Sequence, residues 1–276
     1  MVLLEKNQYD QVRDSLRKVT VNNLFALSVI EGHVTGKVYA DQTSRASSFY
    51  IVHPYGMSLL FGDTGNDRFN LRLLDYFLNK NQERIKEEWL QAFPEAWNEL
   101  LAALLGDRLV SAGSNHAGDN VKRIELHTRI NFKFNPQKYH RFRQTLNPGK
   151  YEIVRMDGGL FRKMKGSVVP QFFWDSAEDF LGHGIGFSLV IGPDPVSSAY
   201  SAYIIGKQLE LGIETVPEYR GKGLARYTCA ALIDYCLSHG YEPVWSCRLE
   251  NTGSYLLAQK LGFDPTLTLP YYKLPL

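Results

Sequence analysis

Cysteine is scarce in this chain of 276 residues, which contains three: Cys229, Cys236 and Cys247. The first two are seven positions apart on one expected helix, too far along it to be joined by a disulfide. The spacing of the three matches no zinc-binding pattern. The scarcity argues against a disulfide-rich or zinc-stabilised scaffold. We expect reduced thiols in the core of a cytoplasmic protein.

Long hydrophobic runs are also missing. No stretch approaches the roughly 18 uninterrupted apolar residues of a transmembrane helix, so none is expected. The N-terminal segment MVLLEKNQYDQVRD soon becomes charged, which is not the pattern of a signal peptide. With 44% hydrophobic and 22% charged residues, the composition is that of a globular protein, and the length suggests two domains.

An excess of charge of either sign is absent as well. Lys and Arg number 31 against 29 Asp and Glu, and the resulting net charge of +2 gives no reason to expect nucleic acid or a membrane as partner. Residues 137–144 do interleave basic and aromatic side chains, a pattern that can contact RNA. The balanced net charge favours a solvated helix there.

Hydrophobic spacing in the N-terminal half predicts both helices and short strands. We expect helices at residues 8–19, 22–34, 68–78 and 85–105, the last interrupted near Pro94, and strands at 36–40, 48–53, 57–61 and 121–134. A loop is expected at residues 113–120. The turn Asn147-Pro148-Gly149-Lys150 marks the domain boundary. It divides the chain into an N-terminal α/β domain of residues 1–146 and a C-terminal domain of residues 147–276.

The C-terminal half predicts strands and helices in an order that repeats part of the first half. We expect strands at residues 151–156, 187–191, 196–204, 243–247 and 266–273, one beginning at 209, and helices at 176–181, 223–238 and 252–260. Three strands followed by a helix occur at 36–78 and again at 187–238. The N-terminal domain is therefore expected to be a degenerate copy of the second. In the first half, residues 62–67 stand where the second half has a glycine-rich turn before its helix. They carry two carboxylates, which repel phosphate.

The stretch of residues 209–225, LELGIETVPEYRGKGLA, is where we expect the chemistry. Leu209, Leu211 and Ile213 alternate with glutamate or glycine, which predicts a strand. Pro217 cannot donate to a ladder, so the chain leaves the sheet there and enters a helix through a glycine-rich turn. Glycines let backbone N–H groups approach an anion, and a helix N-terminus points its positive dipole end at the same place. This corner therefore predicts a phosphate or pyrophosphate site.

Two common phosphate motifs do not fit this corner. A P-loop requires Ser or Thr after Gly-Lys, where this chain has Gly223, and a dinucleotide fingerprint requires glycine where it has Arg226. The pattern Arg/Gln-x-x-Gly-x-Gly/Ala does fit, through Arg220, Gly223 and Ala225.

That pattern is the phosphate loop of the GNAT acyltransferase superfamily, and the similarity extends further along the chain. The family's downstream Asn-x-x-Ala-x-x-Leu-x-x-Lys-x-Gly-Phe signature is matched by Asn251, Ser254, Leu257 and Lys260-Leu261-Gly262-Phe263. Residues 184–276 therefore resemble a GNAT domain. The chain layout also resembles a GNAT subgroup that includes the zwittermicin A resistance protein.

The resemblance implies an α+β fold whose C-terminal mixed sheet is flanked by helices, with acetyl-CoA as cosubstrate and no metal. In the family, backbone groups of one strand bind pantetheine, which here implies Ile213, Glu214 and Thr215. The pyrophosphate positions correspond to Arg220, Gly221, Lys222, Gly223, Leu224 and Ala225. Lys222 can equally be a solvent-facing lysine. Asn251 can cap the following helix and, by resemblance, also reach the cofactor.

Catalysis needs a group that takes a proton from the attacking ammonium and one that protonates the departing thiolate. Glu210 matches the position of the family's frequent base, with Glu214 on the same strand face as second choice. The family's frequent acid is a tyrosine where this chain has Ala258. Tyr255, one turn earlier, is an alternative acid or a plain packing residue, and Ser246, Cys247 and His183 are other polar groups near the expected cleft.

We therefore expect an N-acetyltransferase that acylates a primary amine, most readily on a small molecule. Two alternatives stay open. The first is a non-catalytic acyl-CoA-binding or regulatory protein that kept the pocket but lost the acid at Ala258. The second is an enzyme that acylates a protein or peptide amine. The acceptor pocket is expected between residues 172 and 187, with a contribution from the N-terminal domain.

Overall fold

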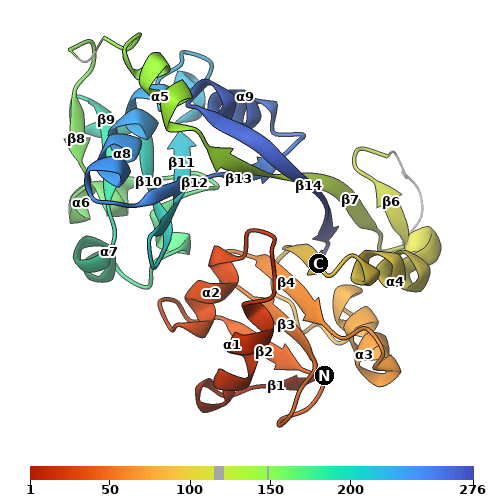
Figure 1. The fold of residues 1–276 in the computed structure, drawn as a ribbon. Coiled ribbons are helices and arrows are strands. Elements are labelled where there is room, and N and C mark those ends of the chain that lie inside the picture. Colours follow the sequence, from red (N-terminus) through yellow and green to blue (C-terminus); the bar gives the residue numbers. More distant parts are fainter. Residues whose placement is uncertain (115–120, 148) are drawn as a thin grey trace. The chain divides into compact units, whose positions relative to one another are not determined.

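The computed structural model describes residues 1–114, 121–147 and 149–276, and its backbone divides into two compact units (Figure 1). Unit 1 comprises Met1–Ile130, Arg248–Glu250 and Leu267–Leu276, and unit 2 comprises Asn131–Cys247 and Asn251–Thr266. The first change of unit follows Ile130, earlier than the boundary expected after residue 146, because the long strands at 124–134 and 263–274 each contribute to both units. Pro148 of the expected turn and residues 115–120 of the expected loop lie outside the described residues.

Unit 1 starts with a short strand and two helices, continues with three strands and a helix, and then alternates strands with helical segments. Its elements are β1 (Val2–Leu3), η1 (Lys6–Gln8), α1 (Asp10–Leu16), α2 (Leu24–Ile30), β2 (Lys37–Ala40), β3 (Ser48–Val52), β4 (Met57–Gly62), α3 (Asp67–Phe77), β5 (Glu88–Phe93), α4 (Ala96–Leu105), η2 (Gly106–Arg108) and β6 (Leu109–Ser111). Strand β7 (Ile124–Phe134) then passes into unit 2.

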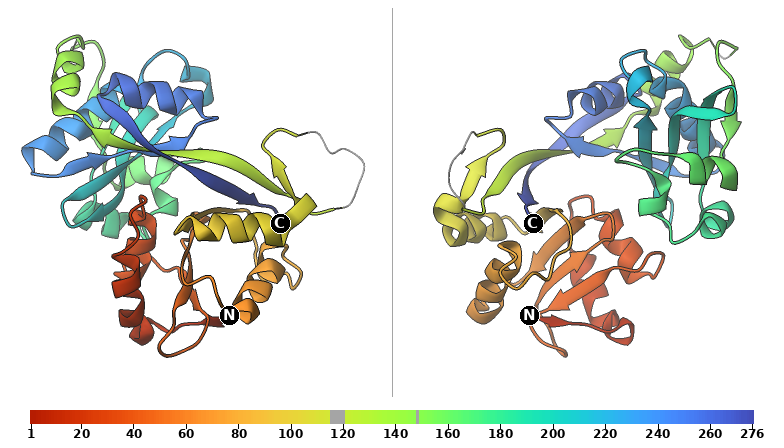
Figure 2. Two further views of the ribbon diagram at one scale, coloured as in Figure 1. Left: turned by 45° about the vertical axis from the view of Figure 1, so that its right-hand side comes forward. Right: turned by 180° about the vertical axis from the view of Figure 1, so that it is seen from behind.

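Unit 2 repeats this order after one further helix. Its elements are α5 (Pro136–Arg143), β8 (Ile153–Arg155), α6 (Gly158–Lys163), η3 (Pro170–Phe172), α7 (Ala177–His183), β9 (Gly186–Ile191), β10 (Asp194–Ile205), β11 (Gln208–Thr215), η4 (Pro217–Tyr219), α8 (Ala225–Ser238), β12 (Glu242–Val244), β13 (Ser246–Arg248) and α9 (Thr252–Lys260). Strand β14 (Phe263–Leu274) returns to unit 1 and lies beside β7 (Figure 2).

The strand pairing is the same in both units. The order β1-β2-β3-β4-β5 in unit 1 corresponds to β8-β9-β10-β11-β12 in unit 2. In each set the first four strands are antiparallel neighbours, and the fifth is parallel to the fourth. The internal repeat expected from the order of elements is therefore present in the sheet topology.

Two sequence predictions were wrong. The expected helix at residues 85–105 is instead a strand, β5, followed by the helix α4. Strand β5 pairs with β4 on one side and β14 on the other. A central strand is buried on both faces and loses the alternation that would mark it. The expected strand at 243–247 is two strands, β12 and β13, which belong to different sheets. The short elements β1, β6 and α6 were not foreseen, because so few residues carry no clear period.

Helices cover both faces of the unit 2 sheet. On one face Phe187 of β9 packs against Tyr235 of α8, with ring centroids 6.3 Å apart. On the other face, Tyr200 of β10 packs against Phe173 beside η3 at 5.9 Å. A Cβ at Gly186 would also lie 3.2 Å from Phe180 of α7. Segment α6–η3–α7 and helix α8 therefore enclose the sheet from opposite sides.

Candidate active site

Strand β11 loses its partner strand halfway along one edge. Its pairing with β12 covers only Gln208 to Glu210, whereas its pairing with β10 on the other edge continues to Thr215. After Trp245 the chain enters β13, which belongs to the other sheet. Within the described part of the chain, no strand therefore lies beside this edge of β11 from Leu211 onward. Backbone groups on such an edge can bind an extended ligand.

The corner after β11 exposes the start of helix α8. Gly221 and Gly223 both have left-handed backbone conformations, with φ of +74° and +70°. Helix α8 begins at Ala225, two residues later than the sequence predicted. Leu224 at its N-cap makes no side-chain capping bond, and its first turn holds no acidic residue. The N–H groups of that turn are left without a side-chain cap, as an anion site requires.

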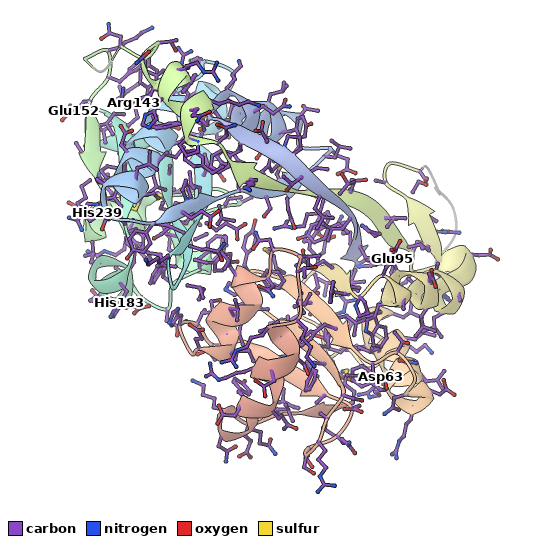
Figure 3. The ribbon with its side chains drawn as sticks, in the orientation of Figure 1. Asp63, Glu95, Arg143, Glu152, His183 and His239 are labelled. Carbon is purple, nitrogen blue, oxygen red and sulfur yellow. The ribbon has the colours of Figure 1, made fainter. Side chains whose placement is uncertain are left out.

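The corresponding corner of unit 1 is closed by its own side chains. Asn66 caps α3 by accepting a hydrogen bond from the Phe69 N–H at 3.1 Å, and Asp67 places a carboxylate in the first turn. Asp63, labelled in Figure 3, accepts from the Gly65 N–H at 3.1 Å. Strand β4 also stays paired with β5 as far as Phe61. This corner of unit 1 therefore lacks both the open strand edge and the uncapped helix start that the corner of unit 2 has.

Three cationic side chains lie at the corner of unit 2. Arg220 donates from Nε to the Thr215 carbonyl and from Nη2 to Glu214, each at 2.9 Å. Lys222 is exposed, with its ammonium 4.8 Å from the centre of the Tyr219 ring. Arg226 in the first turn of α8 places Nε 3.5 Å from where a Gly223 Cβ would lie. The sequence showed only that Arg226 stands where a dinucleotide motif requires glycine. Its position at the corner makes Arg226 an additional candidate for holding a phosphate.

Two carboxylates lie on one face of β11 in different surroundings. Glu210 is 6% exposed and accepts a hydrogen bond from the Ser246 hydroxyl at 2.6 Å. Glu214 accepts from the backbone N–H groups of Ser167 and Val168 as well as from Arg220. Glu210 therefore has a hydroxyl partner, whereas Glu214 is enclosed by hydrogen-bond donors.

Tyr200 occupies the space between these carboxylates and was missed in the sequence. Its Cα is paired with that of Gly212, which lies between Glu210 and Glu214 along β11. A Cβ at Gly212 would lie 2.5 Å from the Tyr200 ring and 2.8 Å from its hydroxyl oxygen. Glycine is therefore required at 212 to make room for the ring. The strand expected at residues 196–204 includes Tyr200, but nothing in its pattern signalled a place between the two carboxylates.

Helix α9 carries the remaining predicted site residues. Asn251 caps it by accepting from the Ser254 N–H at 3.2 Å, so its expected capping role is confirmed. Tyr255 is half-buried, with its ring 5.6 Å from that of Phe132 on β7. Ala258 is completely buried. Tyr255 therefore has an aromatic packing partner, and the Ala258 position faces the core.

The cysteines and His183 have surroundings that do not suit nucleophilic catalysis. All three cysteines are buried, and none of them forms a disulfide. Burial raises the pKa of the Cys229 thiol far above its usual range and that of Cys236 to about 12, so both stay protonated. His183 ends α7 (Figure 3) and pairs with Asp179 at 3.1 Å on the surface. These observations agree with core thiols and a solvated histidine.

Comparison with known proteins decides the family. The family model described as GNAT acetyltransferase matches residues 16–272, which is nearly the whole chain and includes both units. The chain belongs to the GNAT acetyltransferase family. The open edge of β11 and the corner at residues 220–225 lie inside the matched region.

One relative is similar to this chain in sequence, and two solved structures are similar to it in fold. An uncharacterized N-acetyltransferase, YdfB of Bacillus subtilis, is 29% identical over 254 residues, covering 90% of this chain and 89% of the relative. A GCN5-related N-acetyltransferase-like protein from Streptococcus suis has a TM-score of 0.70 at 20% identity over 97% of this chain and 98% of its own. A tandem GNAT protein from the clavulanic acid biosynthesis pathway has a TM-score of 0.58 at 13% identity, covering 99% and 97%.

GNAT acetyltransferases use acetyl-CoA, and the corner of unit 2 fits the anionic part of that molecule. Two left-handed glycines, an uncapped helix start and nearby cations are the groups that a pyrophosphate requires. Among the described residues, no group of three or more His, Cys, Asp or Glu side chains is arranged to hold a metal ion. No helix in the same part of the chain is long and apolar enough to cross a membrane.

Proposed function

We propose that this GNAT acetyltransferase transfers an acetyl group from acetyl-CoA to a primary amine on a small molecule. One observation carries the proposal: the open edge of β11 leads directly to the uncapped N-terminus of α8. An extended pantetheine chain can add to the strand edge while its pyrophosphate meets the helix start. The layout that resembles the zwittermicin A resistance subgroup is part of this proposal.

Acetyl-CoA would be held mainly by backbone groups. Along β11 we assign the pantetheine to Ile213, Glu214 and Thr215. The Thr215 N–H already donates to Glu214, and its carbonyl already accepts from Arg220. Ile213 is therefore the strongest candidate of the three for binding the pantetheine. The pyrophosphate is assigned to Arg220, Gly221, Lys222, Gly223, Leu224 and Ala225, with Arg226 added to the set. Asn251 caps α9 through its side-chain oxygen, which leaves its amide nitrogen to reach the cofactor.

Glu210 is the proposed base. Acetyl-CoA supplies an activated acetyl thioester, but an alkylammonium group cannot attack it before losing a proton. The Glu210 carboxylate would take that proton, directly or through water, and the Ser246 hydroxyl would orient it. Glu214 is a weaker candidate, because Ser167, Val168 and Arg220 already occupy its oxygens.

The departing thiolate must be protonated, but this chain has Ala258 at the position where many GNAT enzymes have a tyrosine for that step. Tyr255 is the proposed donor because it is half-buried one turn earlier on α9. Its packing against Phe132 supports the alternative that it is structural, in which case solvent or another hydroxyl protonates the thiolate.

The domain assignment follows from the comparison of the two corners. We propose that residues 147–276 form the catalytic domain and that residues 1–146 form a companion domain without a cofactor site. The closed corner of α3 and the pairing of β4 with β5 as far as Phe61 support a companion domain without a cofactor site.

A two-part experiment tests the proposal. Isothermal calorimetry measures CoA binding to the full chain, and a thiol-release assay with acetyl-CoA screens a library of small primary amines and peptides. We expect micromolar to millimolar CoA binding and thiol release with small amines. Binding without release would favour an acyl-CoA sensor, and release only with peptides would favour a protein acetyltransferase. Absence of CoA binding at millimolar ligand would overturn the proposal.

A further inference from the structure

Glu214 is a buried carboxylate that joins two segments far apart in the sequence. Its side chain is 7% exposed. Oε2 accepts hydrogen bonds from the backbone N–H groups of Ser167 and Val168, each at 2.9 Å, and from the Ser167 hydroxyl at 3.4 Å. Oε1 accepts from Arg220 Nη2 at 2.9 Å and from the Thr215 N–H at 3.2 Å. One side chain therefore connects residues 166–168 to the phosphate corner.

The segment at 166–168 is shaped around this carboxylate. Gly166 has φ of +148°, and a Cβ there would lie 2.4 Å from Glu214 Oε2. No side chain can occupy that space while Glu214 keeps its position. Gly166 therefore allows the backbone to close over the carboxylate, so that two consecutive N–H groups can reach the same oxygen.

The segment also lies on the functional side of β11. It connects α6 to η3 and α7, and these elements cover the sheet face that carries Tyr200. Glu210, Gly212 and Glu214 lie on that face, because side chains two residues apart along a strand share a face. On the proposed function, in which Glu210 is the base, the acceptor enters on this face beside the covering elements. Residues 166–168 are therefore on the acceptor side.

Hydrogen bonds fix one side of the Arg220 guanidinium and leave the rest of it exposed to solvent. Its Nε and Nη2 donate inward to Thr215 and Glu214, whereas its side chain is 56% exposed. A guanidinium has five N–H donors, so several remain for an anion at the corner. Restricting this flexible side chain before a ligand arrives lowers the entropy that binding must remove.

We infer that Glu214 is a positioning residue that couples the phosphate corner to the acceptor-side segment 166–168. The inference rests on the proposed function for the location of CoA. A pyrophosphate that fixes Arg220 also fixes its partner Glu214, and Glu214 in turn holds the N–H groups of Ser167 and Val168. CoA binding therefore strengthens the hydrogen bonds that already hold the acceptor side, although the two segments are about 50 residues apart in sequence.

Hydrogen exchange measures this coupling without knowledge of the acceptor. The rates for the peptide that contains Ser167 and Val168 are measured in the full chain with and without saturating CoA. In the wild type, CoA should slow this exchange by about tenfold, the effect of strengthening one charge-assisted hydrogen bond.

Glu214→Gln keeps the size of the side chain but removes its charge, so it should weaken CoA binding by about tenfold and abolish the CoA-dependent slowing. Glu218→Gln is the matched control, because it removes the same charge from the exposed segment η4. It should behave as the wild type in both measurements.

Arg220→Met keeps the test valid if Glu214→Gln does not fold, because Arg220 is largely exposed. It should leave the exchange of Ser167 and Val168 without CoA near the wild-type rate. Because Arg220 is also assigned to the pyrophosphate, CoA affinity should fall, so the response is measured at CoA concentrations that calorimetry shows to be saturating for this variant, and it should be absent there. Wild-type protein that binds CoA with no change in this exchange would overturn the inference. Wild-type protein that does not bind CoA would overturn the proposed function instead.

Discussion

Two glutamates on one strand can have different roles when their hydrogen-bond partners differ. Glu210 and Glu214 are four residues apart on β11 and are both buried. Glu210 has Ser246 as hydrogen-bond partner, whereas Glu214 is held by two backbone N–H groups and an arginine. A carboxylate whose oxygens already accept from an arginine and two backbone N–H groups is poorly suited to take up a proton and well suited to position those donors. We therefore assign the base to Glu210 and the positioning role to Glu214.

Glu210→Gln tests the base. It keeps the size and hydrogen bonding of the side chain but cannot take a proton, so turnover should fall by roughly 10²- to 10⁴-fold. CoA affinity by calorimetry should stay unchanged. The loss should shrink as pH rises toward the reference amine pKa of about 10.4, because free amine then becomes abundant. Near-normal turnover at neutral pH would rule out Glu210.

Tyr255→Phe tests the thiolate donor. The substitution keeps the ring that packs on Phe132 and removes only the hydroxyl. If Tyr255 donates the proton, turnover should fall by about tenfold or more with unchanged CoA affinity. Unchanged turnover would identify Tyr255 as a packing residue.

His53 should make unit 1 sensitive to acid. Burial, with a smaller contribution from Lys86, lowers the pKa of His53 to about 3, and its Nδ1 accepts from the Tyr55 N–H at 3.0 Å. Between pH 6.5 and 3 the unfolded chain binds a proton at His53 that the folded chain does not. Stability is therefore lost as pH falls through that window, by about 2 kcal/mol at pH 5.

Urea unfolding at pH 7 and pH 5 measures this loss. His53→Asn retains an acceptor for Tyr55 but does not titrate, so it should lose about 2 kcal/mol less than the wild type between the two pH values. The raised pKa of Glu88, caused mainly by burial, acts in the opposite direction and cancels in this comparison. His183→Asn, at an exposed histidine, should behave as the wild type. An equal loss in the wild type and His53→Asn would contradict the prediction.

At the scale of elements, the start of a helix decides whether an anion can bind. Helices α3 and α8 occupy equivalent places in the two units. The first is capped by Asn66 and carries Asp67 in its first turn, whereas the second has no side-chain cap and no acidic residue there. A side-chain cap satisfies the same N–H groups that a phosphate would use.

Gly223→Val should abolish CoA binding, with a loss of affinity of about a hundredfold or more. The side chain would occupy the space where backbone N–H groups meet the phosphate, and valine is also strained at φ of +70°. Gly240→Val is the matched control, because φ there is +74° and a Cβ meets nothing within 4 Å. Calorimetry should show normal CoA binding for Gly240→Val. Loss of binding in both variants would point to strain instead of blocked access.

At the scale of the whole chain, one cofactor site is expected for two units of the same topology. Calorimetry should give one CoA per chain, and Gly223→Val should remove all binding. Asp63→Asn, which changes the closed corner of unit 1, should leave both affinity and stoichiometry unchanged. Two CoA molecules per chain, or residual binding in Gly223→Val, would show that unit 1 also has a site.

The sequence by itself determined the local features: the strand beginning at residue 209, the glycine-rich corner, the helix cap at Asn251, and most of the order of elements in each half. These depend on alternation, backbone freedom and capping, which act over a few residues. The same local order was enough to identify the repeat.

Only the tertiary structure decided which features meet. Strand β5 was predicted to be helical because the strands that pair with it, β4 and β14, come from residues distant in sequence. The division between β12 and β13 at Trp245, which opens the edge of β11, depends on the sheet that each strand joins. The contacts of Glu214 with Ser167 and Val168 join positions that no local pattern relates. Long-range pairing selects among conformations that a short segment permits about equally, so tertiary contacts set the site's geometry.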